Sequence, residues 1–439
     1  MYRKTVDSDA DFDAVVRRLC GGAGQGMDNV LADKMDAARA IVDAVRERGD
    51  GALAEYTERF DGVSLSPGEF ELGPDALEEA AAGIDRELLA ALERAHGNIR
   101  LFHSKHLRES WEEVSDDGSL VGQRITPIES VGVYVPGGKA FYPSSVLMNI
   151  VPARVAGVRE IVMVSPPSHE GSIHPAVLAA AKLAGADRVF RVGGAQAVAA
   201  LAYGTESVPK VLKITGPGNA YVTAAKALVR SVCDIDTEAG PSEVTVIADG
   251  GANPRFAAFE MFAQAEHDEE ASSFLLTTSE ALAEEVAKIL REESATLSRS
   301  EIIRASLESR GAIVVVRDLD EAVGLTNLIA PEHLAIYTEA PGQVLESIEN
   351  AGAIMVGEMT TVAHGDYFAG PNHILPTGRQ ARFSSPLSTE DFRKVSSVIS
   401  FSAARAAQAG EDVVKLATAE GLSAHAKAAH LRQWKGLAR

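Results

Sequence analysis

The stretch EAGPSEVTVIADGGANPRFAAFEMFAQAEHD, residues 238–268, runs through a turn, an apolar β-type segment and a helical pattern in direct succession. Asn253 can cap a helix with its side chain, and Pro254 suits the first helical position. These signals predict a helix from Pro254 to about Glu266. A strand followed at once by a helix is the repeating unit of a parallel α/β fold, so this stretch indicates that fold class.

One face of the predicted helix carries Phe256, Phe259 and Ala263, and their spacing predicts that this face packs on a core. At about 100° per residue, His267 falls roughly 20° from Phe256, which directs its imidazole inward, with Gln264 on a neighbouring strip. A buried imidazole needs a partner. That partner is either a carbonyl or carboxylate acceptor, or a metal ion.

The same alternation of strands and helices extends in both directions from this stretch. Before it lie the runs VGVYV (131–135), EIVMVS (160–165), RVFRVG (188–193) and KVLKIT (210–215), each followed by a helical pattern. After it lie SFLLTTS (273–279), GAIVVVRD (311–318) and HLAIYT (333–338). We therefore predict an α/β protein with two Rossmann-like parallel-sheet domains, one inserted in the other.

The predicted domain organisation has four parts. A helix from about Ser8 to Leu19, followed by the flexible joint GGAGQG, forms an N-terminal helical arm. The tail beyond Leu387 shows short helices and no strand pattern. The boundaries are 1–26 for the arm, 27–133 with 242–386 for the main domain, 134–241 for the inserted domain, and 387–439 for a small C-terminal tail domain.

Composition and charge narrow the class of function. The 439-residue chain has 62 acidic and 42 basic side chains and a formal charge of −20, which disfavours nucleic acid and membrane surfaces as partners. The chain contains no signal-peptide pattern and no run of 18 apolar residues, and Cys20 and Cys233 form no CxxC pair. We expect a cytoplasmic protein that acts on small molecules.

Three glycine-containing loops follow strands of the inserted domain: YVPGGKAFYPSS (134–145), GGAQAVAA (193–200) and TGPGNAYV (215–222). Their backbone amides could approach an anionic ligand, beside the polar side chains of Tyr134, Gln196 and Asn219. Tight turns also require glycine, but three such loops in one sheet favour a ligand. Neither a P-loop nor a complete Gly-x-Gly-x-x-Gly occurs, so a dinucleotide would bind atypically.

Three further segments carry groups suited to proton transfer or metal binding. NLIAPEHL (327–334) places Glu332 beside His333, a pair that can move protons near neutral pH. HGDYFAGPNHILPTG (364–378) is an apolar loop that contains Asp366 and His373. In AEGLSAH (419–425), Ser423 is expected to cap a helix, which would place His425 in the first turn with Glu420 just before it.

Gln264, His267, Asp366 and His425 together offer imidazole, carboxylate and amide donors. Such a nitrogen and oxygen set suits zinc with positions left open for substrate. By contrast, His103 and His106 have ligand-like spacing but are surrounded by basic residues, so we expect both to be solvated helix residues.

The chain resembles histidinol dehydrogenases through a series of long motifs in the same order. They are RERGDGALAEYTERFDG, VGVYVPGGKAFYPSSVLMNIVPARVAGV, GGAQAVAALAYGT, KITGPGNAYV, AGPSEVTVIAD, AQAEHD, APEHL, GDYFAGPNHILPTG and AEGLSAH. The resemblance implies a homodimer in which the tail crosses to the partner subunit, so that the active site is shared. It also implies oxidation of L-histidinol through the aldehyde to L-histidine with two NAD.

The resemblance further implies a role for each motif residue. His333 would take the hydroxyl proton and Glu332 would help to activate water for the second oxidation. The zinc ligands, one zinc per site, would be Gln264, His267, Asp366 and His425; the substrate contacts would be these four residues with Ser242, His333, His373 and Glu420; and the NAD contacts would be Tyr134, Gln196 and Asn219.

Several alternatives stay open at the level of the sequence. A relative of the same family could oxidise another small alcohol, such as a sulfonated diol. The same donors with Glu332 as water activator would also suit a zinc hydrolase, and the incomplete nucleotide motifs would suit a non-catalytic binding protein. Pro386, where the family commonly has glycine, bears on the hinge geometry of the tail.

Overall fold

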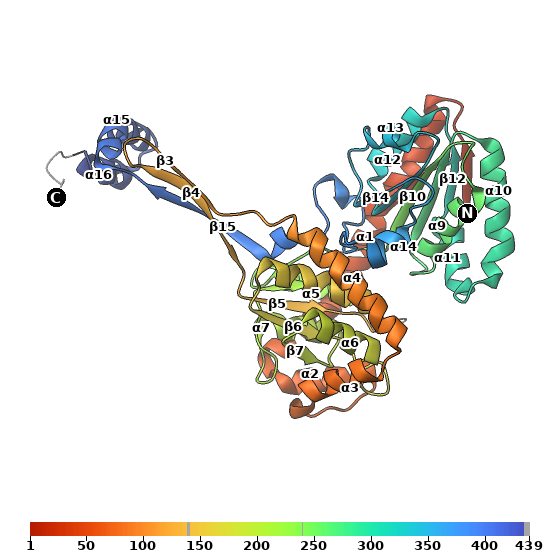
Figure 1. Ribbon diagram of the computed structural model, residues 1–439, viewed down its shortest axis with the longest axis horizontal. Helices are drawn as coiled ribbons and strands as arrows, with labels where there is room; N and C mark the ends of the chain where they lie inside the picture. Colours follow the sequence, from red (N-terminus) through yellow and green to blue (C-terminus); the bar gives the residue numbers. More distant parts are fainter. Residues whose placement is uncertain (138–140, 239, 434–439) are drawn as a thin grey trace. The chain divides into compact units, whose positions relative to one another are not determined.

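The computed structural model describes residues 1–137, 141–238 and 240–433, with the side chains of 21–33 left out. The chain divides into two compact units (Figure 1). Unit 1 comprises Met1–His106 and Glu129–Phe392, and unit 2 comprises Leu107–Ile128 and Arg393–Arg439.

Unit 1 contains a six-stranded sheet in which all neighbouring strands are parallel. Its four central strands are buried on both faces, as expected for a parallel sheet covered by helices, whereas the two edge strands are only partly buried. In order across the sheet they are β1 (Tyr2–Thr5), β12 (Ala312–Val315), β11 (Ser272–Thr277), β10 (Glu243–Ala248), β13 (His333–Tyr337) and β14 (Ala353–Val356). The helices around this sheet are α9 (Pro254–Ala265), α10 (Glu280–Glu293), α11 (Ser300–Arg310), α12 (Leu319–Ile329), α13 (Pro341–Leu345) and α14 (Val362–His364).

A second six-stranded sheet in unit 1 is parallel except at one edge, where β2 and β7 are antiparallel. Its order is β2 (Glu71–Leu72), β7 (Arg188–Phe190), β6 (Glu160–Val164), β5 (Ser130–Tyr134), β8 (Lys213–Thr215) and β9 (Asp234–Ile235). Its helices are α5 (Pro143–Ala156), α6 (Pro175–Ala184), α7 (Gly194–Tyr203) and α8 (Ala220–Val229). The predicted fold class is confirmed, because this whole sheet lies in the sequence between β1 and β10.

The inserted domain takes in more of the chain than the range 134–241. Strand β5 begins at Ser130, and β2 comes from a segment that we assigned to the main domain. Ile41, Leu53 and Phe70 belong to the same buried cluster as the second sheet. Helix α2 (Asp50–Asp61) therefore packs on the core of this sheet, while α3 (Pro74–Gly83) and α4 (Arg86–Ser104) pack on the sheet's helices α5 and α6, which their helical periodicity alone could not show.

The N-terminal segment differs from the predicted arm. Residues 2–5 form the edge strand β1, and α1 continues from Asp9 to Arg48 through the glycines expected to form a joint. Glycine lowers helix propensity by about 1 kcal/mol per residue. Packing outweighs this cost, because Val15 and Leu19 pack on the core of the first sheet while Ile41 packs on that of the second.

The buried face of α9 is not the predicted one. Phe256 and Phe259 are 42% and 38% exposed, whereas Ala257, Met261 and Phe262 are buried in the core of the first sheet. Alanine lets the helix backbone approach the sheet closely, so the packed face combines small residues such as Ala257 with Met261 and Phe262, and Phe256 and Phe259 lie outside it. The N-cap was predicted correctly, since the Asn253 side chain accepts a hydrogen bond from the Arg255 amide.

His103 is not a solvated residue. It is 1% exposed, and neither ring nitrogen has a hydrogen-bond partner among the described residues. Burial, with a smaller effect from His106, lowers the pKa of His103 to about 4. Of the basic neighbours that suggested exposure, only Arg100 lies on α4, whereas Lys105 and Arg108 follow the end of the helix at Ser104.

Unit 2 contains a three-stranded antiparallel sheet with two helices (Figure 1). Its strands are β3 (Trp111–Val114), β4 (Leu120–Pro127) and β15 (Arg393–Ser400), and its helices are α15 (Ala403–Ala419) and α16 (Ser423–Leu431). The predicted tail therefore contains a strand that we did not predict, and this strand pairs with a segment assigned to the main domain. Strand β15 has no buried residue, so it lacks the alternation that marks a half-buried strand. No helix in the described part of the chain is both long and apolar enough to span a bilayer.

Candidate active site

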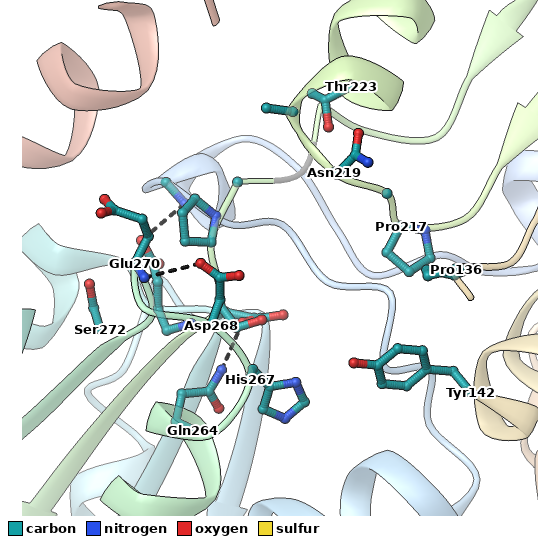
Figure 2. Close-up of a pocket in the computed structure, with 18 of the residues that line it drawn as sticks. Pro136, Tyr142, Pro217, Asn219, Thr223, Gln264, His267, Asp268, Glu270 and Ser272 are labelled. Carbon is teal, nitrogen blue, oxygen red and sulfur yellow. Dashed lines mark hydrogen bonds between the residues drawn. The ribbon is translucent and has the colours of Figure 1, made fainter. Parts of the chain in front are cut away.

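Unit 1 contains a cavity of about 1150 Å³ that is bordered by loops of both sheets. The second sheet contributes the carboxyl ends of its strands, through Pro136 after β5 and Pro217 after β8 (Figure 2). The first sheet contributes the amino ends of its strands, where Ser242 precedes β10 and His333 begins β13. Ligands of parallel sheets commonly bind at the carboxyl ends of the strands, which describes the second sheet but not the first.

A row of carboxylate, imidazole and carboxylate forms part of the cavity wall. His333 Nε2 lies 3.0 Å from Asp366 Oδ1, and His333 Nδ1 lies 3.5 Å from Glu332 Oε2 in an ionic contact without hydrogen-bond geometry. Burial lowers the pKa of His333, but the charges of Glu332 and Asp366 outweigh burial and hold it well above its ordinary value. The row can therefore stabilise a proton on the imidazole.

Local backbone geometry fixes Glu332 in this row. Its Oε2 accepts a hydrogen bond from the Glu243 amide at 2.8 Å, at the start of β10. Gly352 approaches so closely that a Cβ there would lie 2.6 Å from the Glu332 carbonyl oxygen. Glu332 is thus held by the neighbouring strand and by a close backbone approach that requires glycine.

Asp366 lies in a single π-helical turn, Gly365–Ala369, that follows α14. Burial raises its pKa, but the charge and hydrogen bond of His333 outweigh burial and leave it lowered. The Asp366 carbonyl oxygen is 3.0 Å from His373 Nδ1, and His373 Nε2 is 3.1 Å from Ser145 Oγ on α5. Ser145 is a site residue that sequence reasoning missed, although it lies within the motif that contains Tyr134.

Gln264 lies in the last turn of α9, His267 lies in the turn that follows the helix, and both border the cavity (Figure 2). Gln264 is 1% exposed, and its amide Nε2 donates to Glu332 Oε2 at 3.5 Å. Because the Gln264 amide nitrogen faces Glu332, the side-chain carbonyl oxygen of Gln264 is the atom that could coordinate a cation. Tyr142, which precedes α5, points its hydroxyl group into the same cavity (Figure 2).

The residues that line the cavity suit part of the predicted metal site. Gln264, His267 and Asp366 all border it and supply amide, imidazole and carboxylate donors. No three His, Cys, Asp or Glu side chains gather as a metal site among the side chains that the structure describes. The predicted set takes only two side chains of those types, His267 and Asp366, from unit 1.

The other two predicted residues, Glu420 and His425, belong to unit 2 and are exposed. His425 lies in the first turn of α16, as expected. The N-cap is Leu422 rather than Ser423, and it makes no side-chain capping bond.

The three predicted dinucleotide contacts all border the cavity. The Tyr134 hydroxyl oxygen accepts a hydrogen bond from the Gly194 amide at 3.2 Å, and burial raises the Tyr134 pKa to about 12. Gln196 is buried, and neither of its amide atoms has a partner in the described part of the chain. Asn219 also has a structural role, because its Oδ1 caps α8.

Comparison with known proteins decides the family. A family model described as histidinol dehydrogenase matches residues 27–433. A histidinol dehydrogenase of Syntrophotalea carbinolica is 48% identical over 435 residues, covering 98% of this chain and 99% of the relative. Another from Geobacter sulfurreducens is 50% identical over 430 residues, covering 98% of each chain. The chain belongs to the histidinol dehydrogenase family.

A crystal structure of histidinol dehydrogenase from Elizabethkingia anophelis has the same fold, with a TM-score of 0.90, 31% identity and 98% of each chain covered. The resemblance drawn from the motifs is therefore confirmed. Membership in the histidinol dehydrogenase family supports an oxidoreductase function in histidine biosynthesis.

The structure of this histidinol dehydrogenase family member also contains a buried ion pair that no motif indicated. Lys226 and Asp236 pair with side chains that are each 3% exposed. Lys226 Nζ donates to the Gly216 carbonyl oxygen at 3.1 Å, and Asp236 Oδ2 accepts from the Gly216 amide at 2.7 Å. The pair thereby fixes the loop that carries Pro217 and Asn219 along the cavity. Gly216 has φ +112°, and a Cβ there would lie 2.0 Å from the Tyr134 carbonyl oxygen, so glycine is required.

Proposed function

We propose that this protein catalyses the NAD-dependent, four-electron oxidation of L-histidinol to L-histidine through L-histidinal, the last two steps of histidine biosynthesis. The observation that carries the proposal is the buried row of Glu332, His333 and Asp366, which borders the same cavity as the dinucleotide-type loops. The substrate is inferred from the names of the relatives, which are histidinol dehydrogenases.

His333 is proposed as the general base. Oxidation of an alcohol removes a proton from the hydroxyl group and a hydride from the carbon. The His333 imidazole takes the proton, and its two carboxylate neighbours stabilise the imidazolium that results. NAD, when bound, supplies the hydride acceptor for each oxidation.

Glu332 is proposed to act in the second oxidation. The aldehyde must add water before it can lose a second hydride, and a carboxylate beside the reacting carbon can take a proton from that water. Glu332 is held in place by the Glu243 amide, which leaves its orientation independent of the bound substrate.

Gln264, His267 and Asp366 would hold zinc together with His425 of a tail. Zinc, when bound, would supply a positive centre that anchors substrate nitrogen atoms. Ser242 and His373 border the cavity and would contact the substrate, and Glu420 would contact it from the tail.

The proposed homodimer is supported by the surface of unit 2. This unit buries few side chains and exposes many large apolar ones, which is unusual for a surface that faces only water. A second copy of the chain would cover them and bring Glu420 and His425 to its cavity. The exposed apolar residues include Val114, Val395, Ile399, Val413, Leu416, Leu422 and Leu431.

The purified protein loaded with zinc should be incubated with L-histidinol and NAD. We expect two NADH for each histidine formed, with no free aldehyde accumulating. A sulfonated diol in place of histidinol serves as the competing substrate. Absence of histidinol turnover with zinc bound, or a higher kcat/KM for the diol, would contradict the proposal.

A further inference from the structure

Asp61 is a carboxylate for which the proposed chemistry has no use. It is the last residue of α2 and borders the cavity together with Tyr134 and Gln196. Its Oδ2 atom is buried and has no hydrogen-bond partner among the described residues. Burial raises the pKa of this carboxyl group to about 6.

The placement of Asp61 brings no visible benefit to the fold. The carboxyl end of a helix carries partial negative charge, so an acidic side chain is unfavourable there. The helix is already terminated by Gly62, whose amide donates to the Glu58 carbonyl oxygen. Burial of such a carboxylate costs free energy of folding. A carboxylate of this kind that borders a cavity is a candidate for ligand binding.

A second group with unused hydrogen-bonding capacity borders the same cavity. Gln196 is 1% exposed, yet its amide nitrogen and oxygen both lack partners within the described residues. The backbone makes room for this amide, because a Cβ on Gly194 would lie 2.5 Å from Gln196 Oε1. Gly194 also has φ +67°, which favours glycine.

Tyr134 links these two groups. Its hydroxyl oxygen accepts from the Gly194 amide, which leaves the hydroxyl proton to be donated. Burial raises the pKa of Tyr134, and the charge of Asp61 adds to that rise, so the two side chains lie within electrostatic reach. The Asp61 carboxylate thus accepts hydrogen bonds, and the Tyr134 hydroxyl group can donate one. The Gln196 amide can do both.

We propose that Asp61, together with Gln196 and Tyr134, binds the neighbouring hydroxyl groups of a ribose of the dinucleotide and selects NAD over NADP. The inference rests on the proposed function, which supplies the dinucleotide. Each ribose hydroxyl group donates one hydrogen bond, and a carboxylate accepts two. The 2′-phosphate of NADP would instead bring a second anion against Asp61, and like charges repel in a partly buried site.

The test compares Asp61→Asn with the wild type in the full-length, zinc-loaded protein. Calorimetry without histidinol gives Kd for NAD and for NADP, and steady-state assays with histidinol give kcat and KM. We expect Kd and KM for NAD to rise about 10-fold, which is the scale of one hydrogen bond to a charged group, with kcat at saturating NAD nearly unchanged. The ratio of kcat/KM for NADP to that for NAD should rise by about 10-fold or more.

Glu58→Gln is the matched control, because it removes an exposed carboxylate from the same helix. Neither its dinucleotide constants nor its kcat should change. Thermal unfolding separates binding from stability: Asp61→Asn should leave Tm unchanged or raise it, since the substitution removes a buried charge that lacks a partner.

An unchanged Kd for NAD with an unchanged NADP to NAD ratio would overturn the assignment of Asp61. A lower Tm with unaltered dinucleotide constants would also overturn it, because that result describes a structural residue. A wild-type protein that binds NAD but does not oxidise histidinol would overturn only the proposed function, and the comparison of Kd values would still decide the role of Asp61.

Discussion

His333 Nε2 lies 3.0 Å from Asp366 Oδ1, so the proposed base and a proposed metal ligand are in direct contact. His333 begins a strand, whereas Asp366 lies in a π-helical turn. One carboxylate can face both the imidazole and a cation because it has two oxygen atoms. In the proposed mechanism, the contact would link proton transfer at His333 to the position of the metal that anchors the substrate.

Replacing His333 with asparagine should lower kcat by about 10³-fold, which is within the usual contribution of a general base. KM for histidinol should change much less, because the asparagine leaves Gln264 and His267 in place. Steady-state kinetics with NAD measure both constants. His106→Asn, which changes an exposed histidine in the turn after α4, is the control and should retain wild-type kcat. Equal losses in the two variants would show that His333 is not the base.

Removing one partner of the buried Lys226–Asp236 pair should destabilise the protein by about 3–5 kcal/mol, because a buried charge is left alone. Lys226→Met and Asp236→Asn should each show this loss in urea unfolding. The double variant should lose less than the sum of the two, since the partners interact. Both single variants should also bind NAD more weakly, because the pair holds Gly216. Additive losses in the double variant would contradict the coupling.

The buried His103 should make stability depend on pH. Its pKa is about 4 in the folded chain and about 6.5 when unfolded, so the unfolded chain binds more protons between these values. The free energy of unfolding should therefore fall as pH falls from about 6.5 to about 4, by roughly 3 kcal/mol in total. Urea unfolding at a series of pH values measures this, and His103→Leu should reduce the slope. If the free energy of unfolding depends on pH equally in His103→Leu and in the wild type, the dependence arises from other groups.

Subunits that share active sites should complement each other. A His333→Asn chain mixed with a His425→Asn chain, under conditions that exchange subunits, should regain activity because some mixed sites are intact. His333→Asn mixed with itself should stay inactive. Verified heterodimers without recovered activity would place the tail on the cavity of its own chain.

Much of the fold could be predicted because strands buried on both faces leave continuous apolar runs, as in EVTVIAD, and because helix caps such as Asn253 act locally. Hydrophobic periodicity alone could not decide which face of a helix is buried. It gave the large Phe256 and Phe259 priority over the alanines that allow close packing in α9. It also could not reveal that the glycines of α1 continue a helix whose two ends are fixed by different cores.

The candidate site was predicted through short motifs, and all of its unit 1 members border one cavity. Ser145, Glu243 and the Lys226–Asp236 pair were missed because their roles arise from contacts between distant segments. Glu243 is an example: burial, followed by the charge of Glu332, raises its pKa to about 8, yet the two residues are far apart in the sequence.

The pairing of β1 with β12 has a consequence for synthesis on the ribosome. Tyr2 pairs with Ala312, whereas every strand of the second sheet lies between Glu71 and Ile235. The inserted domain can therefore complete its sheet while the chain is still growing, but β1 has no partner until β12 has been synthesised. Strand β1 must wait through the synthesis of the whole inserted domain before it can pair.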